Sequence, residues 1–209
     1  AFKQRTGLHL LNQPSEADIN RLAERIRELI GEFLKPVHVV YNMDICAGGV
    51  ADREACGICI TACPYDAINR DSENHLRMTI DHMACEGCGA CVSACPTTSL
   101  SFAEPSPQEI YTRISALLTP SRISRDQERS VLVFHCGEQG RRALEEAGRT
   151  PLPYSATVLP VEVPCLRYVS EADMLGAFHL GAAGVGLLGC EKCPHGERAL
   201  LYQKLDFAK

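Results

Sequence analysis

Apolar residues recur every three or four positions between residues 15 and 34. This is the spacing of one face of an amphipathic helix. We therefore predict a helix over 15–34, with Ser15 as its N-cap, Asp18 three residues further on and Lys35-Pro36 at its end. The opposite face is charged. Such a helix either packs on its own domain or docks on a partner subunit.

The pattern changes after residue 105. A short helix is expected over 106–118, followed by a polar linker to residue 129. Beyond it, short continuous apolar runs alternate with helical patterns, which is typical of a small α/β domain with a parallel sheet over 130–209. The expected strands are 131–135, 158–163 and 184–188, and the expected helices are 138–147, 171–180 and 197–207. Pro160 favours an edge position for the second strand.

Composition argues against two classes of protein, nucleic-acid binders and transmembrane proteins. The 209 residues carry a net charge of -5 and no Trp, which argues against a nucleic-acid binder. The longest uncharged run is Met174–Cys190, with five glycines in 17 residues, which is too short and too glycine-rich for a transmembrane helix. No secretory signal opens the sequence. We therefore expect a cytoplasmic protein.

Eight of the twelve cysteines lie in one internal repeat. Residues 56–68 align with 88–100 at an offset of 32 positions, and six of the thirteen positions are identical. The second copy, from Cys85, reads C-x2-C-x2-C-x3-C-P, the run of bacterial two-cluster ferredoxins, whose fourth Cys binds the other cluster. Interleaved copies of this kind disfavour zinc, which prefers two C-x2-C pairs per site.

The first copy departs from the run, because Arg53 stands where its first Cys should be and Cys46 lies seven residues upstream. Asp52 as an oxygen ligand, or a three-iron cluster, are the alternatives to Cys46. With Cys46 as a ligand, the two expected [4Fe-4S] sites have four cysteines each. They are Cys46, Cys56, Cys59 and Cys95 for cluster 1, and Cys63, Cys85, Cys88 and Cys91 for cluster 2.

These motifs make the segment 41–105 resemble a bacterial-type two-[4Fe-4S] ferredoxin domain. The resemblance implies an α+β ferredoxin-like fold, βαββαβ, with a central hairpin of 67–70 and 76–80. The segment has nine acidic residues against three arginines. Residues 1–40 would form an N-terminal segment, and 106–129 a helix and linker to the next domain.

The other four cysteines follow the predicted strands of the last domain: Cys136, Cys165, Cys190 and Cys193. The carboxyl ends of parallel strands meet at one edge, where α/β sheets build their sites. Spacing alone leaves open a [2Fe-2S] cluster, structural zinc, or a thiol–disulfide pair at Cys190 and Cys193. His135 and His195 flank this site, and we expect one to donate a hydrogen bond near it and the other to lie on the surface. Imidazole ligation of a two-iron centre is the alternative.

Residues 130–209 resemble the delta subunit of methyl-viologen-reducing hydrogenase, through the strand-end Cys136, the Val-Pro-Cys165 segment, the stretch 177–185 and Gly189-Cys190. The resemblance implies a [2Fe-2S] cluster on these four cysteines. It also implies electron transfer between a hydrogenase or formate dehydrogenase and a heterodisulfide-reductase-like flavoprotein.

The sequence shows no nucleophilic triad, paired carboxylates or phosphate loop. We therefore expect an electron-transfer subunit of a hetero-oligomeric oxidoreductase complex with no substrate chemistry of its own. Two alternatives remain. One is an enzyme with thiol–disulfide chemistry at Cys190 and Cys193, fed by the ferredoxin domain. The other is a ferredoxin fused to a zinc-stabilised docking module.

Overall fold

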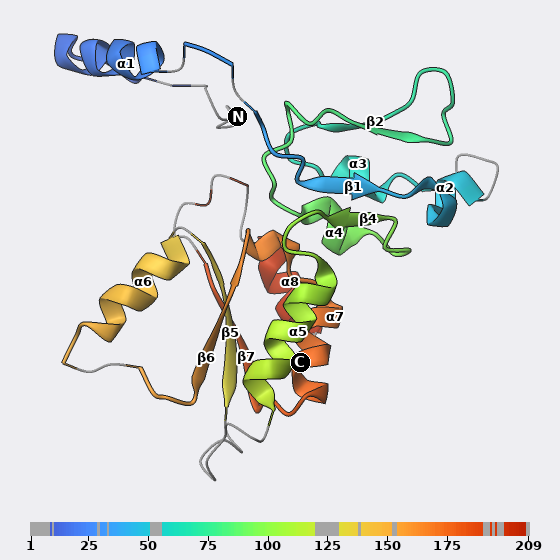
Figure 1. Cartoon of the computed structure of the whole chain (residues 1–209), viewed down its shortest axis with the longest axis vertical. Helices are drawn as coiled ribbons and strands as arrows, with labels where there is room; N and C mark the ends of the chain where they lie inside the picture. Colours follow the sequence, from blue (N-terminus) through green and yellow to red (C-terminus); the bar gives the residue numbers. More distant parts are fainter. Residues whose placement is uncertain are drawn as a thin grey trace.

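The structure is a computed structural model of the chain. It describes residues 9, 11–28, 30–32, 34–50, 56–119, 130–137, 139–151, 154–189, 193, 195 and 199–207. The linker predicted up to residue 129 lies almost wholly outside these residues, as do Asp52, Arg53 and Cys190. Figure 1 shows a leading helix, a cysteine-rich half formed by residues 34–104, and a sheet half formed by residues 106–207.

Helix α1 runs from Glu16 to Glu28. Its start agrees with the prediction, because the Ser15 amide donates to Asp18 (3.0 Å) and the Asp18 amide donates back to Ser15 Oγ (3.3 Å). The predicted end at residue 34 is wrong. Gly31 adopts a φ of +148°, which a helix cannot contain. No residue of α1 is buried, and Figure 1 shows the helix projecting from the rest of the chain.

The cysteine-rich half contains two antiparallel strand pairs. Its elements are β1 (Val39–Tyr41), η1 (Met43–Ile45), α2 (Ala47–Val50), α3 (Ile58–Ala62), β2 (Ile68–Arg70), β3 (Met78–Ile80), α4 (Ala90–Ala94) and β4 (Leu100–Phe102). Strand β1 pairs with β4, and β2 with β3 in the register Ile68 to Ile80. The predicted hairpin is therefore present, with shorter strands.

The sheet half holds three parallel strands in the order β6-β5-β7. They are β5 (Val131–Cys136), β6 (Val158–Val163) and β7 (Gly184–Leu188). Leu132 and Phe134 of the central strand are fully buried, as the continuous apolar run predicts. Pro160 lies in β6, which is an edge strand among the described residues, so its missing N–H costs no ladder bond.

Helices cover both faces of this sheet. Figure 1 shows α6 (Gln139–Gly148) on one side and α5 (Pro107–Leu118), α7 (Glu171–His179) and α8 (Ala199–Phe207) on the other. Reciprocal hydrogen bonds between Ser106 and Glu109 cap α5, and those between Ser170 and Asp173 cap α7. Among the described residues, no helix combines the length and apolar character needed to cross a membrane.

The two halves share one hydrophobic core, which continues from β1–β4 into the sheet. The link is the short 3-10 helix η4 (Leu166–Tyr168), which packs on α4. The Tyr168 ring meets Phe102 edge-on, with 5.3 Å between ring centroids. This contact places the cysteine-rich half against the carboxyl-terminal edge of the sheet, since η4 follows strand β6.

Candidate metal centres

Four cysteines line a small cavity of about 20 Å³ in the cysteine-rich half, here called cavity 1. Its cysteines are Cys46, Cys56, Cys59 and Cys95. They come from the turn before α2, from the start of α3 and from the C-cap of α4. These are the cysteines predicted from the sequence for cluster 1, brought together from segments 49 residues apart.

A second cavity of about 20 Å³, here called cavity 2, is lined by the other four cysteines of the repeat. They are Cys63, Cys85, Cys88 and Cys91. Helix α3 carries Cys59 towards cavity 1 and ends at Cys63 in cavity 2, while α4 carries Cys91 in cavity 2 and ends at Cys95 in cavity 1. The structure thus groups the thiols in two interleaved sets of four, and their role as iron ligands stays a prediction.

Glycines let the backbone wrap closely around these cavities. Gly87 and Gly89 line cavity 2 with φ of +64° and +72°, a region in which other residues are strained. A Cβ at Gly87 would lie 2.9 Å from the His38 ring, and a Cβ at Gly48 would lie 3.8 Å from Cys46 Sγ. The close backbone brings amide donors to the sulfurs, as the Ala67 amide does at 3.4 Å from Cys63 Sγ.

Two of the four thiols of cavity 1 ionise more readily than usual, whereas burial raises the pKa of the third, Cys59. Burial opposes ionisation of Cys46, but interactions with the Tyr41 hydroxyl, the amides of Gly49 and Gly48, and Ser99 lower its pKa below the ordinary value. Burial likewise opposes ionisation of Cys95, whose pKa is nevertheless lowered by backbone amides, Ser99 and Thr97.

In cavity 2, three of the four thiols resist ionisation. Burial is the main cause that raises the pKa of Cys85, Cys88 and Cys91 above the ordinary value. Cys88 and Cys91 are each 7% exposed. Four thiols in such a place hold negative charge only when a bound cation compensates it. The donor set and the low exposure of cavity 2 therefore fit a [4Fe-4S] cluster bound by thiolates.

The four thiols of each cavity do not converge on one point. Among the described parts of the chain, no group of three or more His, Cys, Asp or Glu side chains is arranged to hold a single metal ion. Each set of four thiols instead lines a small cavity.

Three of the four predicted cysteines of the sheet half lie within the described residues. Cys136 is the last residue of β5 rather than following it, and it pairs in register with Val163, two residues before Cys165. The Gly140 amide donates to Cys136 Sγ at 3.3 Å. Cys165 and Cys193 interact sulfur to sulfur, which raises the pKa of Cys165 and lowers that of Cys193. Cys190 lies outside the described residues, so the complete set is not seen.

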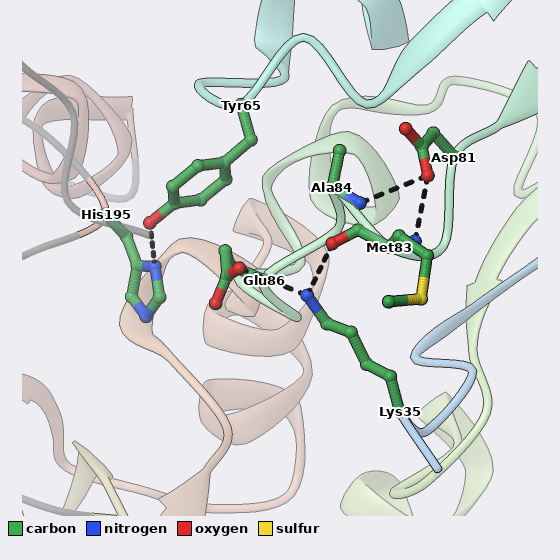
Figure 2. Close-up of polar contacts among 7 residues, drawn as sticks. All are labelled: Lys35, Tyr65, Asp81, Met83, Ala84, Glu86 and His195. Atoms are coloured by element: carbon green, nitrogen blue, oxygen red, sulfur yellow. Dashed lines mark hydrogen bonds and ion pairs between the residues drawn. The ribbon is translucent and has the colours of Figure 1, made fainter. Parts of the chain in front are cut away.

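The two flanking histidines differ in exposure. His135 is 5% exposed, and its Nδ1 is 3.2 Å from the Cys136 carbonyl oxygen. His195 is partly exposed, and its Nδ1 atom is 2.5 Å from the Tyr65 hydroxyl, as Figure 2 shows. The expectation that one histidine donates near the site and the other lies on the surface stays a prediction. Arg167 completes the contact by donating to the His195 carbonyl at 2.7 Å.

Figure 2 also shows how the chain before β1 is held against cavity 2. Lys35 donates to the Met83 carbonyl at 2.8 Å and pairs with Glu86 at 3.1 Å. Both charged side chains are less than one-fifth exposed. Glu86 lies between Cys85 and Cys88 and lines cavity 2, so this ion pair fixes the loop that carries those two thiols.

The residues that sequence reasoning missed are those that surround the sulfurs: Tyr41, Tyr65, Thr97, Ser99 and Arg167. Thr97 and Ser99 were visible in the repeat as positions where the two copies differ. Tyr65 and Arg167 gave no local signal, because their partners are 130 and 28 residues away in the sequence.

Two cavities of four thiols each, on a frame of short antiparallel strands, define an iron–sulfur protein of the electron-transfer class. Comparison with protein families agrees. Residues 53–99 match the family described as 4Fe-4S dicluster domain, and residues 131–204 match the family described as methyl-viologen-reducing hydrogenase, delta subunit. The chain thus contains one segment that is similar to each of these two families. Comparisons with curated proteins and with solved structures gave no match.

Proposed function

We propose that this chain is an electron relay with three centres. Two [4Fe-4S] clusters would occupy cavities 1 and 2, and a [2Fe-2S] cluster would bind Cys136, Cys165, Cys190 and Cys193. The observation that carries the proposal is the sorting of eight thiols into two cavities of equal size. The clusters supply one-electron chemistry when bound. The protein supplies thiolate ligands, amide donors and a surface that excludes water.

The contacts support a spatial order of the three centres, with cavity 2 between cavity 1 and the sheet half. Cys88 of cavity 2 and Cys165 of the sheet half belong to one buried cluster together with Tyr65, Ala67 and Ala90. The hydrogen bond between Tyr65 and His195 spans the same boundary, two residues beyond Cys193. Cavity 2 is therefore the centre that would exchange electrons with the [2Fe-2S] site.

Partners would complete the path. The resemblance to the delta-subunit family points to a hydrogenase or formate dehydrogenase as one partner and to a heterodisulfide-reductase-like flavoprotein as the other. The exposed apolar side chains of α1, Ile19 and Ile26, offer a docking surface. We expect the segment 41–105 to have the ferredoxin-like βαββαβ topology. Its excess of acidic residues would steer this domain towards basic surfaces of a partner.

The direct test is anaerobic quantification of iron, acid-labile sulfide and zinc in the reconstituted full chain. The ligand sets predict about ten iron atoms per chain. About eight iron atoms with one zinc would remove the [2Fe-2S] assignment and favour a zinc-stabilised docking module. Resistance of the sheet-half thiols to alkylation in the native protein is also expected. Rapid labelling of Cys190 and Cys193 would instead favour thiol–disulfide chemistry.

A further inference from the structure

The two cavities are related by the internal repeat but differ in the hydroxyl groups that surround their sulfurs. At the offset of 32 residues, Cys95 of cavity 1 corresponds to Cys63 of cavity 2. Two and four residues beyond these cysteines, Thr97 corresponds to Tyr65 and Ser99 corresponds to Ala67. The same backbone positions thus carry different donors beside the two proposed clusters.

Hydroxyl groups gather on the sulfurs of cavity 1. Ser99 Oγ and Thr97 Oγ1 each lie 3.7 Å from Cys95 Sγ. Ser99, only 3% exposed, also interacts with Cys46. A thiolate that binds iron has no proton to donate, so these hydroxyls would donate to it.

Tyr41 adds a third hydroxyl to cavity 1. Its oxygen is buried and has no hydrogen-bond partner of normal geometry among the described residues. The residue lines cavity 1, where its hydroxyl interacts with the Cys46 thiol. The Met78 backbone also interacts with this hydroxyl, but no described residue reaches it with normal hydrogen-bond geometry, and such a buried hydroxyl is costly. A negatively charged sulfur in the cavity would satisfy it.

Cavity 2 has fewer hydroxyl donors on its sulfurs, although the Gly87 and Ala90 amides interact with two of them. Ala67 has no side-chain donor, and only its amide reaches Cys63 Sγ, at 3.4 Å. The Tyr65 hydroxyl is engaged by His195. Cys88 and Cys91 are both buried beneath the sheet half, whereas in cavity 1 only Cys46 is buried.

Reduction adds one negative charge to a cluster. Hydrogen-bond donors on its sulfurs stabilise the reduced form and raise the potential, whereas burial without donors lowers it. We propose that the cluster in cavity 1 has the higher midpoint potential and holds the first electron, and that Ser99 and Tyr41 are the positioning residues that set this difference. The inference rests on the proposed function. It adds which of the two clusters is reduced when the chain carries a single electron.

The step itself is a one-electron exchange. One electron would leave a reduced cluster held by the thiols of cavity 2, which would become oxidised by one unit, and would enter an oxidised cluster held by the thiols of cavity 1. No bond is formed or broken and no proton is required. The direction follows from the two potentials alone.

The test is an anaerobic reductive titration of the reconstituted full chain with dithionite, followed by EPR. The Cys46→Ser variant assigns the signal of cavity 1. In the unsubstituted chain this signal should appear first as the potential falls. Ser99→Ala and Tyr41→Phe should each shift it to lower potential, and the reciprocal variant Ala67→Ser should shift the signal of cavity 2 to higher potential.

Ser101→Ala is the matched control, since Ser101 lies two residues along the same chain segment, in β4, outside the residues that line cavity 1. It should move neither potential. The inference would be overturned if the cluster of cavity 2 were reduced before that of cavity 1, or if Ser99→Ala and Tyr41→Phe both left the potentials unchanged. Neither result would contradict the proposed electron relay. Fewer than about eight iron atoms in the unsubstituted chain would instead refute the proposed function.

Discussion

The Lys204 ammonium group donates a hydrogen bond to Ser93 Oγ at 2.8 Å. This bond joins α8, the last helix of the sheet half, to helix α4 of the cysteine-rich half. The same ammonium group also donates to the carbonyl oxygens of Arg167 (3.2 Å) and Val169 (2.7 Å). Ser93 in turn donates to the Arg167 carbonyl at 2.7 Å. One partly buried cation thus holds three chain segments at the boundary next to cavity 2.

Replacement of this cation should loosen the boundary. Lys204→Met keeps the length of the side chain but removes its three donors, leaving partly buried oxygens unpaired at a cost of about 1–3 kcal/mol in the free energy of unfolding. Thermal unfolding of the reconstituted chain should show a lower midpoint. Gln203→Met, at an exposed position of the same helix, is the control. Equal effects of the two variants would contradict this role of Lys204.

Gly89 should tolerate no side chain. Its φ is +72°, and a Cβ would lie 2.7 Å from the Tyr168 Cβ atom and 3.0 Å from the Tyr168 Cα atom. Gly89→Ala should therefore destabilise the protein by about 1–3 kcal/mol, and should also weaken the magnetic coupling between the cluster of cavity 2 and the centre of the sheet half. Chemical denaturation and EPR measure the two effects.

Gly176 provides the opposite case. It lies inside α7, and a Cβ there would meet nothing within 4 Å. Gly176→Ala should stabilise the chain by about 0.5–1 kcal/mol, because alanine is the better helix former. If both alanine variants destabilised the chain to the same degree, steric contact with Tyr168 would not be the reason for Gly89.

Acid should destabilise the fold partly through His38. Burial, and then the charge of Lys35, lower its pKa from 6.5, against the opposing effect of Glu86 and with a further lowering effect of His82. The folded protein thus binds the proton less tightly than the unfolded chain, so the free energy of unfolding decreases as the pH falls below about 6.5. His38→Gln should flatten this part of the profile in pH-dependent thermal unfolding. His75→Gln, in the exposed hairpin turn, should leave the slope unchanged.

Cys46 should be an iron ligand. It lines cavity 1 with three other cysteines, while the regular ligand position of the repeat holds Arg53. Cys46→Ser should alter the EPR signal of one [4Fe-4S] cluster and spare the other. An unchanged spectrum would point to Asp52 or to a three-iron centre.

Periodicity predicted most of the sheet half, because a buried parallel strand needs a continuous apolar run, and the strands 158–163 and 184–188 have the predicted bounds. The end of α1 was missed because it depends on the backbone conformation of Gly31, which no periodic pattern reveals. Spacing also predicted the two sets of four thiols that the cavities bring together. The contacts across the two halves, such as Lys204 with Ser93 over 111 residues, arise only from the packing of complete elements.

Helices α3 and α4 are each five residues long, and each spans from one cavity to the other. A cofactor that docks in either cavity therefore fixes one end of both helices and positions a thiol of the neighbouring cavity. Part of the ordering entropy of the second site is then already lost when the first is filled. Cluster insertion into this protein should consequently be cooperative. Chains with both [4Fe-4S] clusters or with neither should dominate during assembly, and chains with only one cluster should be scarce.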